Sequence, residues 1–573
     1  MRIPALASSL SLLMIAMTHC SPSSTRSGLD DKTAPADAAR ALVTEHEVSI
    51  RPLEKAVGLS WWNANVSGKD EDFAAKEAAQ NQLDLALADT GRFARLKAAR
   101  EALRTAPGPR DETLAREIEV LYLQYLEKQV APALLQKMTA KSNAVEKAFN
   151  VYRAKVDGKE MTDSEVRKTL KESKDSAQRK RVWEASKGVG AAVEADLKDL
   201  VKLRNEAARK LGAKSYHALQ LELNEQTQER VLGLFDEIDA LTREPFRAAK
   251  AEIDVQLAKE YGISTAELRP WHYQDPFFQE PPAVFGTDLD AAYKSLDIIQ
   301  LSRDFYGGIG LPIDDVIARS DLYEKPGKSP HAFCTDIDRE GDVRVLANIV
   351  PNEYWMGTML HELGHSVYSS KNIPGSVPYV LRSEAHILTT EGIAMLFEKF
   401  SKSADWLGSM GAKVADPKGF NETGARMRRN RLLIFAAWCQ VMLRFEKAMY
   451  DDPDLDLNKL WWDLAERYQL VHRPEGRSAP DYASKIHIVS APCYYHNYLM
   501  GEMFACQLHH AICREVLKRP PAGAIYSGRK DVGEFLKKRV FEPGRSLPWN
   551  ALTKHATGEE LNAKAFAEDL GSR

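Results

Sequence analysis

The apolar side chains of this chain recur mostly at three- and four-residue steps, which is the period of an α-helix. In residues 113–138 such spacing would place them on one helix face, formed by Leu114, Ile118, Leu121, Tyr122, Tyr125 and Leu126. Residues 93–105 repeat the pattern, and Pro-Gly pairs separate several such segments. The strongest strand signal is the short, β-branched stretch 343–350 (VRVLANIV). The sequence therefore predicts a mainly α fold with very short strands.

Length and charge narrow the class of protein further. The chain has 573 residues and a formal net charge of -3. It is long enough to bury a large core, and helical enzymes of this size can form one body around a cleft. A nucleic-acid partner would require a clustered basic face, which this near-neutral charge balance gives no reason to expect.

The first twenty residues have the pattern of an export signal. Arg2 precedes a largely apolar run, residues 6–17, which is too short to span a bilayer and is followed by Cys20 and a polar stretch. A cysteine directly after the apolar run suggests a bacterial lipoprotein, cleaved before Cys20 and lipidated on it, although residues 17–19 (MTH) depart from the usual small residues. We expect residues 1–20 to be a signal peptide and residues 21–38 a flexible linker. The protein would then be exported to the periplasm or cell envelope, with or without a lipid tether.

Membrane attachment, if present, would be confined to that tether. No other run of the chain is long and apolar enough to cross a bilayer. The other five cysteines are odd in number and irregular in spacing, so they define no disulfide framework. We expect most of them to be small buried side chains.

The stretch MLHELGHSVY, residues 359–368, contains the pattern H-E-x-x-H. In a helix, His361 and His365 lie on one face and can bind one ion, while Glu362 lies near enough to reach a water on that ion. Gly364 costs about 1 kcal/mol of helix stability relative to alanine, and a small residue there suits close approach by another element. The pattern predicts a zinc site with its own general base.

A catalytic zinc site usually has three protein ligands and one open position. Two carboxylates downstream, Glu384 and Glu391, are candidates for the third ligand. Glu391 opens a helical pattern that continues through residues 393–400, so a rigid helix would carry it. Composition and spacing alone do not choose between the two.

These motifs resemble the angiotensin-converting-enzyme family of zinc peptidyl-dipeptidases, of which this chain would be a bacterial member. The family's zinc helix reads H-E-x-G-H, and its third ligand is a glutamate nine residues after an arginine that follows a leucine. Leu381-Arg382 is followed at nine residues by Glu391, so the resemblance selects Glu391. The family also has a substrate-binding histidine before an alanine, thirty residues ahead of the first zinc histidine, and His331-Ala332 stands at that distance here.

Two later segments extend the resemblance. Residues 483–488 (ASKIHI) match the family's A-S-K-x-H-I, and residues 494–513 resemble its tyrosine-bearing helix. The resemblance implies that Lys485 and Tyr495, with Gln274 as a third donor, bind the substrate's C-terminal carboxylate. It also implies that His331, Ala332 and His487 hold the substrate backbone. His487 would steady the tetrahedral intermediate as well, and Tyr498 would donate to the oxyanion.

The resemblance runs in patches from about residue 40 to 570, and it also implies a fold. It implies a large helical ellipsoid formed by residues 39–573, in two halves around a deep central substrate cleft, with very short strands near the zinc site and one Zn²⁺ per chain. Two departures stand out. Met395 replaces a family aspartate that partners a ligand histidine, and Asn497 replaces an arginine linked to chloride activation, which makes chloride activation doubtful here.

The sequence thus predicts a zinc metallopeptidase that releases dipeptides from the C-terminus of oligopeptides, with Glu362 as general base. Two other readings stay open. A thimet-type oligopeptidase also uses H-E-x-G-H on a helical fold but cuts internally and needs no carboxylate clamp. A catalytically silent homologue would bind peptides without cleaving them.

Overall fold

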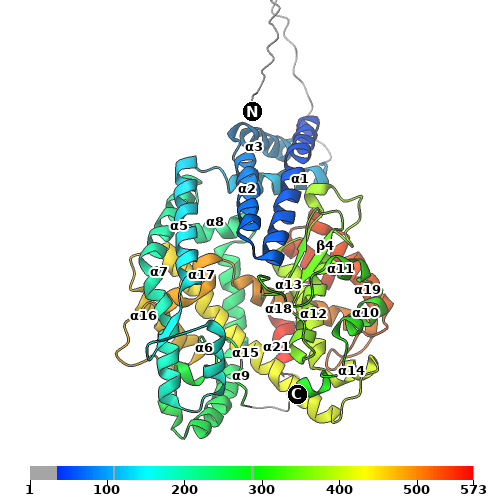
Figure 1. Cartoon of the computed structure of the whole chain (residues 1–573). Coiled ribbons are helices and arrows are strands. Elements are labelled where there is room, and N and C mark those ends of the chain that lie inside the picture. The colour runs from blue at the N-terminus through cyan, green and yellow to red at the C-terminus, as the bar shows by residue number, and fades with distance from the viewer. Residues whose placement is uncertain (1–34, 107–109, 285–288, 330, 572–573) are drawn as a thin grey trace, which may run out of the picture.

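The computed structural model describes residues 35–106, 110–284, 289–329 and 331–571 (Figure 1). Helices dominate these residues, which confirms the predicted mainly α class. The α-helices are α1 (Pro35–Ser67), α2 (Asp70–Leu87), α3 (Thr90–Thr105), α4 (Glu112–Leu126), α5 (Pro132–Val151), α6 (Asp163–Glu172), α7 (Ser176–Lys210), α8 (Tyr216–Leu223), α9 (Gln228–Tyr261), α10 (Ile298–Gly308), α11 (Asp314–Arg319), α12 (Glu353–Tyr368), α13 (Ile387–Glu398), α14 (Ala404–Ser409), α15 (Pro417–Asp451), α16 (Leu457–Leu464), α17 (Ile486–Ser490), α18 (His496–Ile512), α19 (Lys530–Leu536), α20 (Trp549–Thr557) and α21 (Lys564–Gly571).

The strands are short and form two antiparallel hairpins. In one, β1 (Ala154–Val156) pairs with β2 (Lys159–Met161), and in the other, β3 (Phe333–Asp336) pairs with β4 (Val343–Leu346). Both strands of the second hairpin contact α12, the helix of the H-E-x-x-H motif. The expected short strands near the zinc motif are therefore present.

The structure differs from the sequence predictions at three element boundaries. The pattern over residues 113–138 is two helices, because α4 ends at Leu126 and Pro132 starts α5, where proline is favoured. The strand predicted over 343–350 ends at Leu346, after which the backbone of residues 347–349 bonds to that of 321–322. The predicted signal and most of the linker lie outside the described residues, and α1 begins at Pro35, inside the predicted linker.

One large hydrophobic core connects most of the molecule, from Val145 in α5 to Leu570 in α21. The N-terminal helices α1 to α4 have a smaller core of their own, which also takes in Val380 and Leu381. In Figure 1, α1 and α3 lie at the end of the molecule where the N-terminus is marked. Among the described residues, no helix combines the length and the apolar character that a bilayer span requires.

Helix α13 packs unusually closely between α12 and α18, near the middle of Figure 1. A Cβ added to Gly364 of α12 would lie only 2.7 Å from the Cα of Ala394 in α13. On the other side of α13, a Cβ added to Gly392 would lie 2.8 Å from the carbonyl oxygen of Gly501 in α18. These glycines allow backbone contact that no larger residue permits. The contact confirms the close approach expected at Gly364.

Candidate metal centre

Helix α12 carries two histidines whose side chains converge. Asn352 caps its N-terminus, accepting a hydrogen bond from the backbone N–H of Trp355 at 2.8 Å. Three turns of regular helix then bring His361 and His365 onto one face, with their Nε2 atoms 3.2 Å apart. Two ring nitrogens at this spacing can both bind one ion.

Helix α13 supplies a carboxylate at the same point. The Oε2 atom of Glu391 lies 3.4 Å from the Nε2 of His361 and 3.9 Å from that of His365. This oxygen is buried and has no hydrogen-bond partner. Among the described residues, these three form the one group of metal-ligating side chains whose donor atoms converge, within 4.8 Å of one another. Glu384, the other candidate for third ligand, is not part of it.

The donor set fits a zinc ion. Two imidazoles and one carboxylate, with room for a fourth ligand, are the usual protein ligands of catalytic zinc. The buried, unpartnered oxygen of Glu391 is an independent sign, because a carboxylate oxygen is costly to bury without a partner. A cation at the point where the three donors converge would satisfy it.

Each ligand histidine has a partner for its other ring nitrogen. The Nδ1 of His361 lies 3.0 Å from Oε2 of Glu398, at the C-terminal end of α13. The Nδ1 of His365 lies 2.8 Å from the hydroxyl of Thr390. Both contacts leave the Nε2 lone pairs free for the metal, as ligand histidines require.

Glu362 lies beside these ligands and is buried, 8% exposed. Burial raises the pKa of its carboxyl group to about 7, and a hydrogen bond from the backbone N–H of Cys334 in β3 acts in the opposite direction. A divalent cation at the cluster would favour the ionised form and oppose that shift. A carboxylate with few competing partners is suited to take a proton from a nearby water.

A second polar group gathers around Gln279. The ammonium of Lys485, just before α17, donates to Oε1 of Gln279 at 2.6 Å, and the hydroxyl of Tyr495, just before α18, donates to the same oxygen at 3.3 Å. Lys485 lies among the rings of Phe277, Trp438 and Tyr495, each about 5 Å from its Nζ. Burial lowers the pKa of Lys485 to about 8.

Gln274, predicted as the third donor of this group, lies elsewhere. Its Oε1 accepts a hydrogen bond from the backbone N–H of Ala283 at 2.8 Å, and its backbone is in the left-handed region, with φ of 67°. The structure therefore brings Gln279, five residues further along, to Lys485 and Tyr495. Both glutamines belong to one stretch, PWHYQDPFFQE.

The ring of His487 contacts those of both Tyr495 and Tyr498. Its centroid lies 4.8 Å from that of Tyr495 and 6.3 Å from that of Tyr498. The Nδ1 of His487 is buried without a hydrogen-bond partner, and burial lowers the pKa of the ring to about 3. His487 is therefore neutral near pH 7, with a ring nitrogen available to a ligand. Helix α18, which carries Tyr498, packs against α13, which carries Glu391.

Two predicted substrate-binding residues lie in the segment that leads into β3. His331 is exposed, and its backbone N–H donates to the hydroxyl of Ser329 at 3.3 Å. Ala332 is half-buried and packs against the main core. Their roles stay predictions.

The structure shows the surroundings of the two residues that differ from the family pattern, Met395 and Asn497. Met395 is buried in α13, 7% exposed. Asn497 is buried in α18, and its side-chain oxygen accepts a hydrogen bond from Gln226 at 2.9 Å. The side chain of Asn497 is thus part of a buried hydrogen bond between two amide groups in this structure. Chloride activation stays doubtful.

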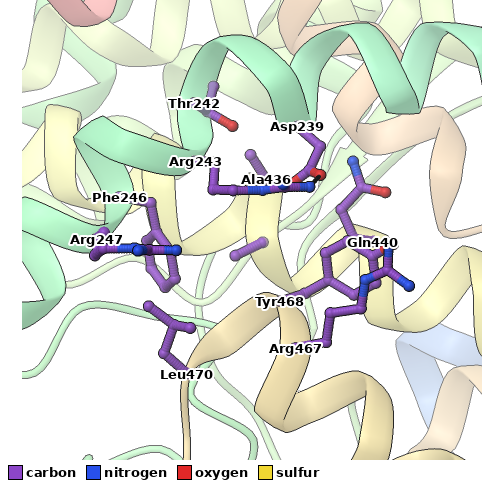
Figure 2. A pocket seen from close by; sticks show the side chains of 11 residues that line it. Asp239, Thr242, Arg243, Phe246, Arg247, Ala436, Gln440, Arg467, Tyr468 and Leu470 are labelled. Carbon is purple, nitrogen blue, oxygen red and sulfur yellow. Dashed lines mark hydrogen bonds and ion pairs between the residues drawn. The ribbon is translucent and has the colours of Figure 1, made fainter.

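Figure 2 shows a small pocket that none of these residues lines. It is lined by parts of α9, α15 and the segment that follows α16, including Arg243, Arg247, Arg467 and Tyr468. Space for water-sized molecules amounts to only about 30 Å³, roughly one or two waters. No predicted site residue contributes to it.

Sequence reasoning missed three residues that contact the predicted site: Gln279, Glu398 and Arg431. A signal for Glu398 was present, since it follows Glu391 by seven residues and so shares its helix face. The guanidinium of Arg431 in α15 lies 2.9 Å from Oε1 of Glu398. Nothing in the sequence links Arg431 to the motif, because α15 approaches only through the tertiary fold.

A mainly helical fold with H-E-x-x-H on one helix, and with a carboxylate from the next helix converging on its histidines, is typical of metallopeptidases. A family model described as angiotensin-converting enzyme matches residues 276–569, slightly more than half of the chain. The chain therefore belongs to the angiotensin-converting enzyme family, a family of peptidases. This result confirms the resemblance found in the motifs.

Individual relatives are distant. An angiotensin-converting enzyme of Theromyzon tessulatum is 26% identical over 290 residues, covering 48% of this chain and 46% of that protein. The enzyme of Mesocricetus auratus is 24% identical over 305 residues, 50% of this chain and 23% of its own length. That of Rattus norvegicus is 22% identical over 455 residues, 71% of this chain and 33% of its own. The chain thus spans less than half of the length of these relatives.

Proposed function

We propose that this protein is a zinc peptidyl-dipeptidase, which hydrolyses oligopeptides and releases dipeptides from their C-terminus. The observation that carries the proposal is the group formed by Lys485, Tyr495 and Gln279. One buried cation and two neutral polar groups converge there, as recognition of a free carboxylate requires. We further propose that residues 39–573 act as one domain in two halves around the substrate cleft.

The chemistry follows from the residues near Glu391. A zinc ion bound there would supply Lewis acidity for the scissile carbonyl and lower the pKa of water. Glu362 takes the proton from the attacking water and later hands it to the leaving amine. Tyr498 donates a hydrogen bond to the oxygen that gains charge. His487, neutral and with a free ring nitrogen, holds the substrate backbone and steadies the tetrahedral intermediate.

The clamp sets where the peptide is cut. A substrate carboxylate would replace Oε1 of Gln279 as the acceptor for Lys485 and Tyr495. Because Lys485 is buried among aromatic rings, its contact with a carboxylate is only weakly screened by water. A fixed distance between this clamp and the metal would leave room for two residues after the cut.

The test is a timed digest of one decapeptide with a free C-terminus and of the same peptide amidated, read by mass spectrometry. Amidation removes the negative charge and leaves Lys485 unpaired. Losing one partner of such a pair costs about 2–5 kcal/mol, or about thirty- to several-thousand-fold in rate. We expect successive dipeptides from the free acid, strong discrimination against the amide, and loss of that discrimination in Lys485→Ala.

The two glutamines provide a matched control. Gln279→Ala should weaken the discrimination between acid and amide, whereas Gln274→Ala should leave it intact, because only Gln279 contacts the clamp. Internal cleavage at equal rates in both peptides would favour the thimet-type oligopeptidase. Retained zinc without cleavage would favour the silent peptide-binding homologue.

We also propose that the protein is exported to the periplasm or cell envelope. The support is the sequence of residues 1–20, in which an apolar run precedes Cys20. A lipid on Cys20 would tether the protein at the membrane surface.

A further inference from the structure

The carboxylate of Glu398 lies between a metal-ligating histidine and an arginine. Its Oε2 is 3.0 Å from Nδ1 of His361, and its Oε1 is 2.9 Å from the guanidinium of Arg431. Each oxygen therefore has one partner, and the three side chains form a chain from α12 through α13 to α15. Arg431 also lies 3.8 Å from Glu502 of α18.

The two ligand histidines are supported differently. The Nδ1 of His365 has a neutral partner, the hydroxyl of Thr390. Only His361 has a charged one, and the carboxylate that provides it is mostly buried, with a side chain 17% exposed. Met395, one turn before Glu398 on α13, has no polar atom with which to do the same.

We propose that Glu398, held in place by Arg431, is the positioning residue for His361, and that it takes over the role for which Met395 is unsuited. This inference rests on the proposed zinc function. By accepting the Nδ1–H of His361, Glu398 fixes the tautomer whose Nε2 lone pair points to Glu391 and His365. Its charge also makes the imidazole a stronger electron donor to a metal. Arg431 keeps the carboxylate from turning away.

The experiment measures zinc affinity by competition with a chelator, together with the melting temperature of the metal-free protein. Glu398→Ala removes both hydrogen bond and charge, and should weaken zinc binding by about 10- to 100-fold, the usual cost of losing such a partner. Glu398→Gln keeps an acceptor but not the charge, and should weaken it by about tenfold. The visible spectrum of the Co²⁺-loaded protein should change in both variants, which a purely structural role would not produce.

Glu502→Gln is the matched control. It changes a buried carboxylate that lies 3.8 Å from Arg431 and, in the described part of the chain, forms no hydrogen bond or ion pair with His361 or His365. Zinc affinity and the Co²⁺ spectrum should therefore stay close to those of the wild type. Arg431→Met should weaken zinc binding as Glu398→Gln does. If Glu398→Ala fails to fold, Glu398→Gln carries the test.

Three results would overturn the inference: zinc affinity of Glu398→Gln within twofold of the wild type, an equal loss in Glu502→Gln, or a wild-type protein without zinc. Peptide cleavage does not enter these measurements. A wild-type protein whose zinc affinity depends on Glu398 but which releases no dipeptides would therefore contradict the proposed function and leave this inference standing.

Discussion

At the scale of single residues, the choice of third metal ligand is open to direct test. Glu391→Ala should lose most of the approximately one zinc per chain that three ligands predict, because its oxygen lies 3.4 Å from the Nε2 of His361. Glu384→Ala should keep it, since Glu384 is outside the group of converging donors. Metal analysis of the purified variants decides the matter, and the opposite pattern would show that the ligand was misassigned.

The general base can be separated from the metal site. Glu362→Gln preserves the shape of the side chain and removes its basicity. Zinc content should be unchanged while turnover falls by at least about a hundredfold, the usual contribution of a positioned base. Steady-state rates and metal analysis on the same preparation test both the turnover and the zinc content. Near-normal turnover in this variant would refute the mechanism.

The clamp predicts a particular dependence on pH. Lys485 must be protonated to hold a carboxylate, and burial lowers its pKa to about 8. Below pH 8 the ammonium is present, and as pH rises through that value it is lost. The kcat/KM for a free-acid peptide should therefore fall about tenfold per pH unit above 8, and the residual rate on the amidated peptide should not show this fall. Lys485→Arg, which stays charged, should shift the fall to higher pH. Parallel profiles for the two peptides would contradict the clamp.

Residue-level prediction succeeded where spacing along one helix decides geometry, as with His361 and His365. It named Gln274 and did not consider Gln279. The backbone turns through left-handed conformations at Gln274 and Phe278, and no pattern of apolar residues reports such turns. Arg431 was out of reach for a related reason, since its contact with Glu398 joins α15 to α13 through the fold.

At the scale of elements, the packing of α12 on α13 should tolerate almost no added volume. Gly364→Ala would place a methyl group 2.7 Å from the Cα of Ala394, so the helices must separate, at a cost of about 1–3 kcal/mol. Gly233→Ala, at an exposed position near the start of α9, meets nothing within 4 Å and should be neutral or stabilise by up to about 1 kcal/mol. Urea unfolding of the metal-free proteins measures both. An equal effect at the two sites would show that the close contact is not a constraint.

Elements themselves were predicted well where the apolar period was long, and less well at their ends. The apolar pattern over residues 113–138 continues across the break between α4 and α5 because both helices are amphipathic. The prediction followed this pattern and did not use Pro132 as the start of a new helix. The end of β4 depends on pairing with residues 321–322. A change of hydrogen-bonding partner from one segment to another cannot be seen in the local sequence pattern.

At the scale of the whole molecule, location is the property that the N-terminal sequence predicts. Changing Cys20 to Ser should release the protein from the membrane fraction of the cells that express it, because the lipid would have no attachment site. Fractionation followed by immunoblotting measures this, with the wild type as reference. A wild-type protein already wholly in the soluble fraction would exclude the tether and leave export itself intact.

The close contacts of α13 also bear on how distant sequences should be judged. Gly364, Gly392 and Gly501 let three backbones meet so that Glu391 reaches the histidines. A homologue that kept H-E-x-x-H but carried bulky residues at these places would hold the carboxylate too far from the two histidines. Its motif would then no longer form a metal site. Inherited together, the three glycines form a fingerprint of a working site that is spread over roughly 140 residues and that a search for the motif alone would overlook.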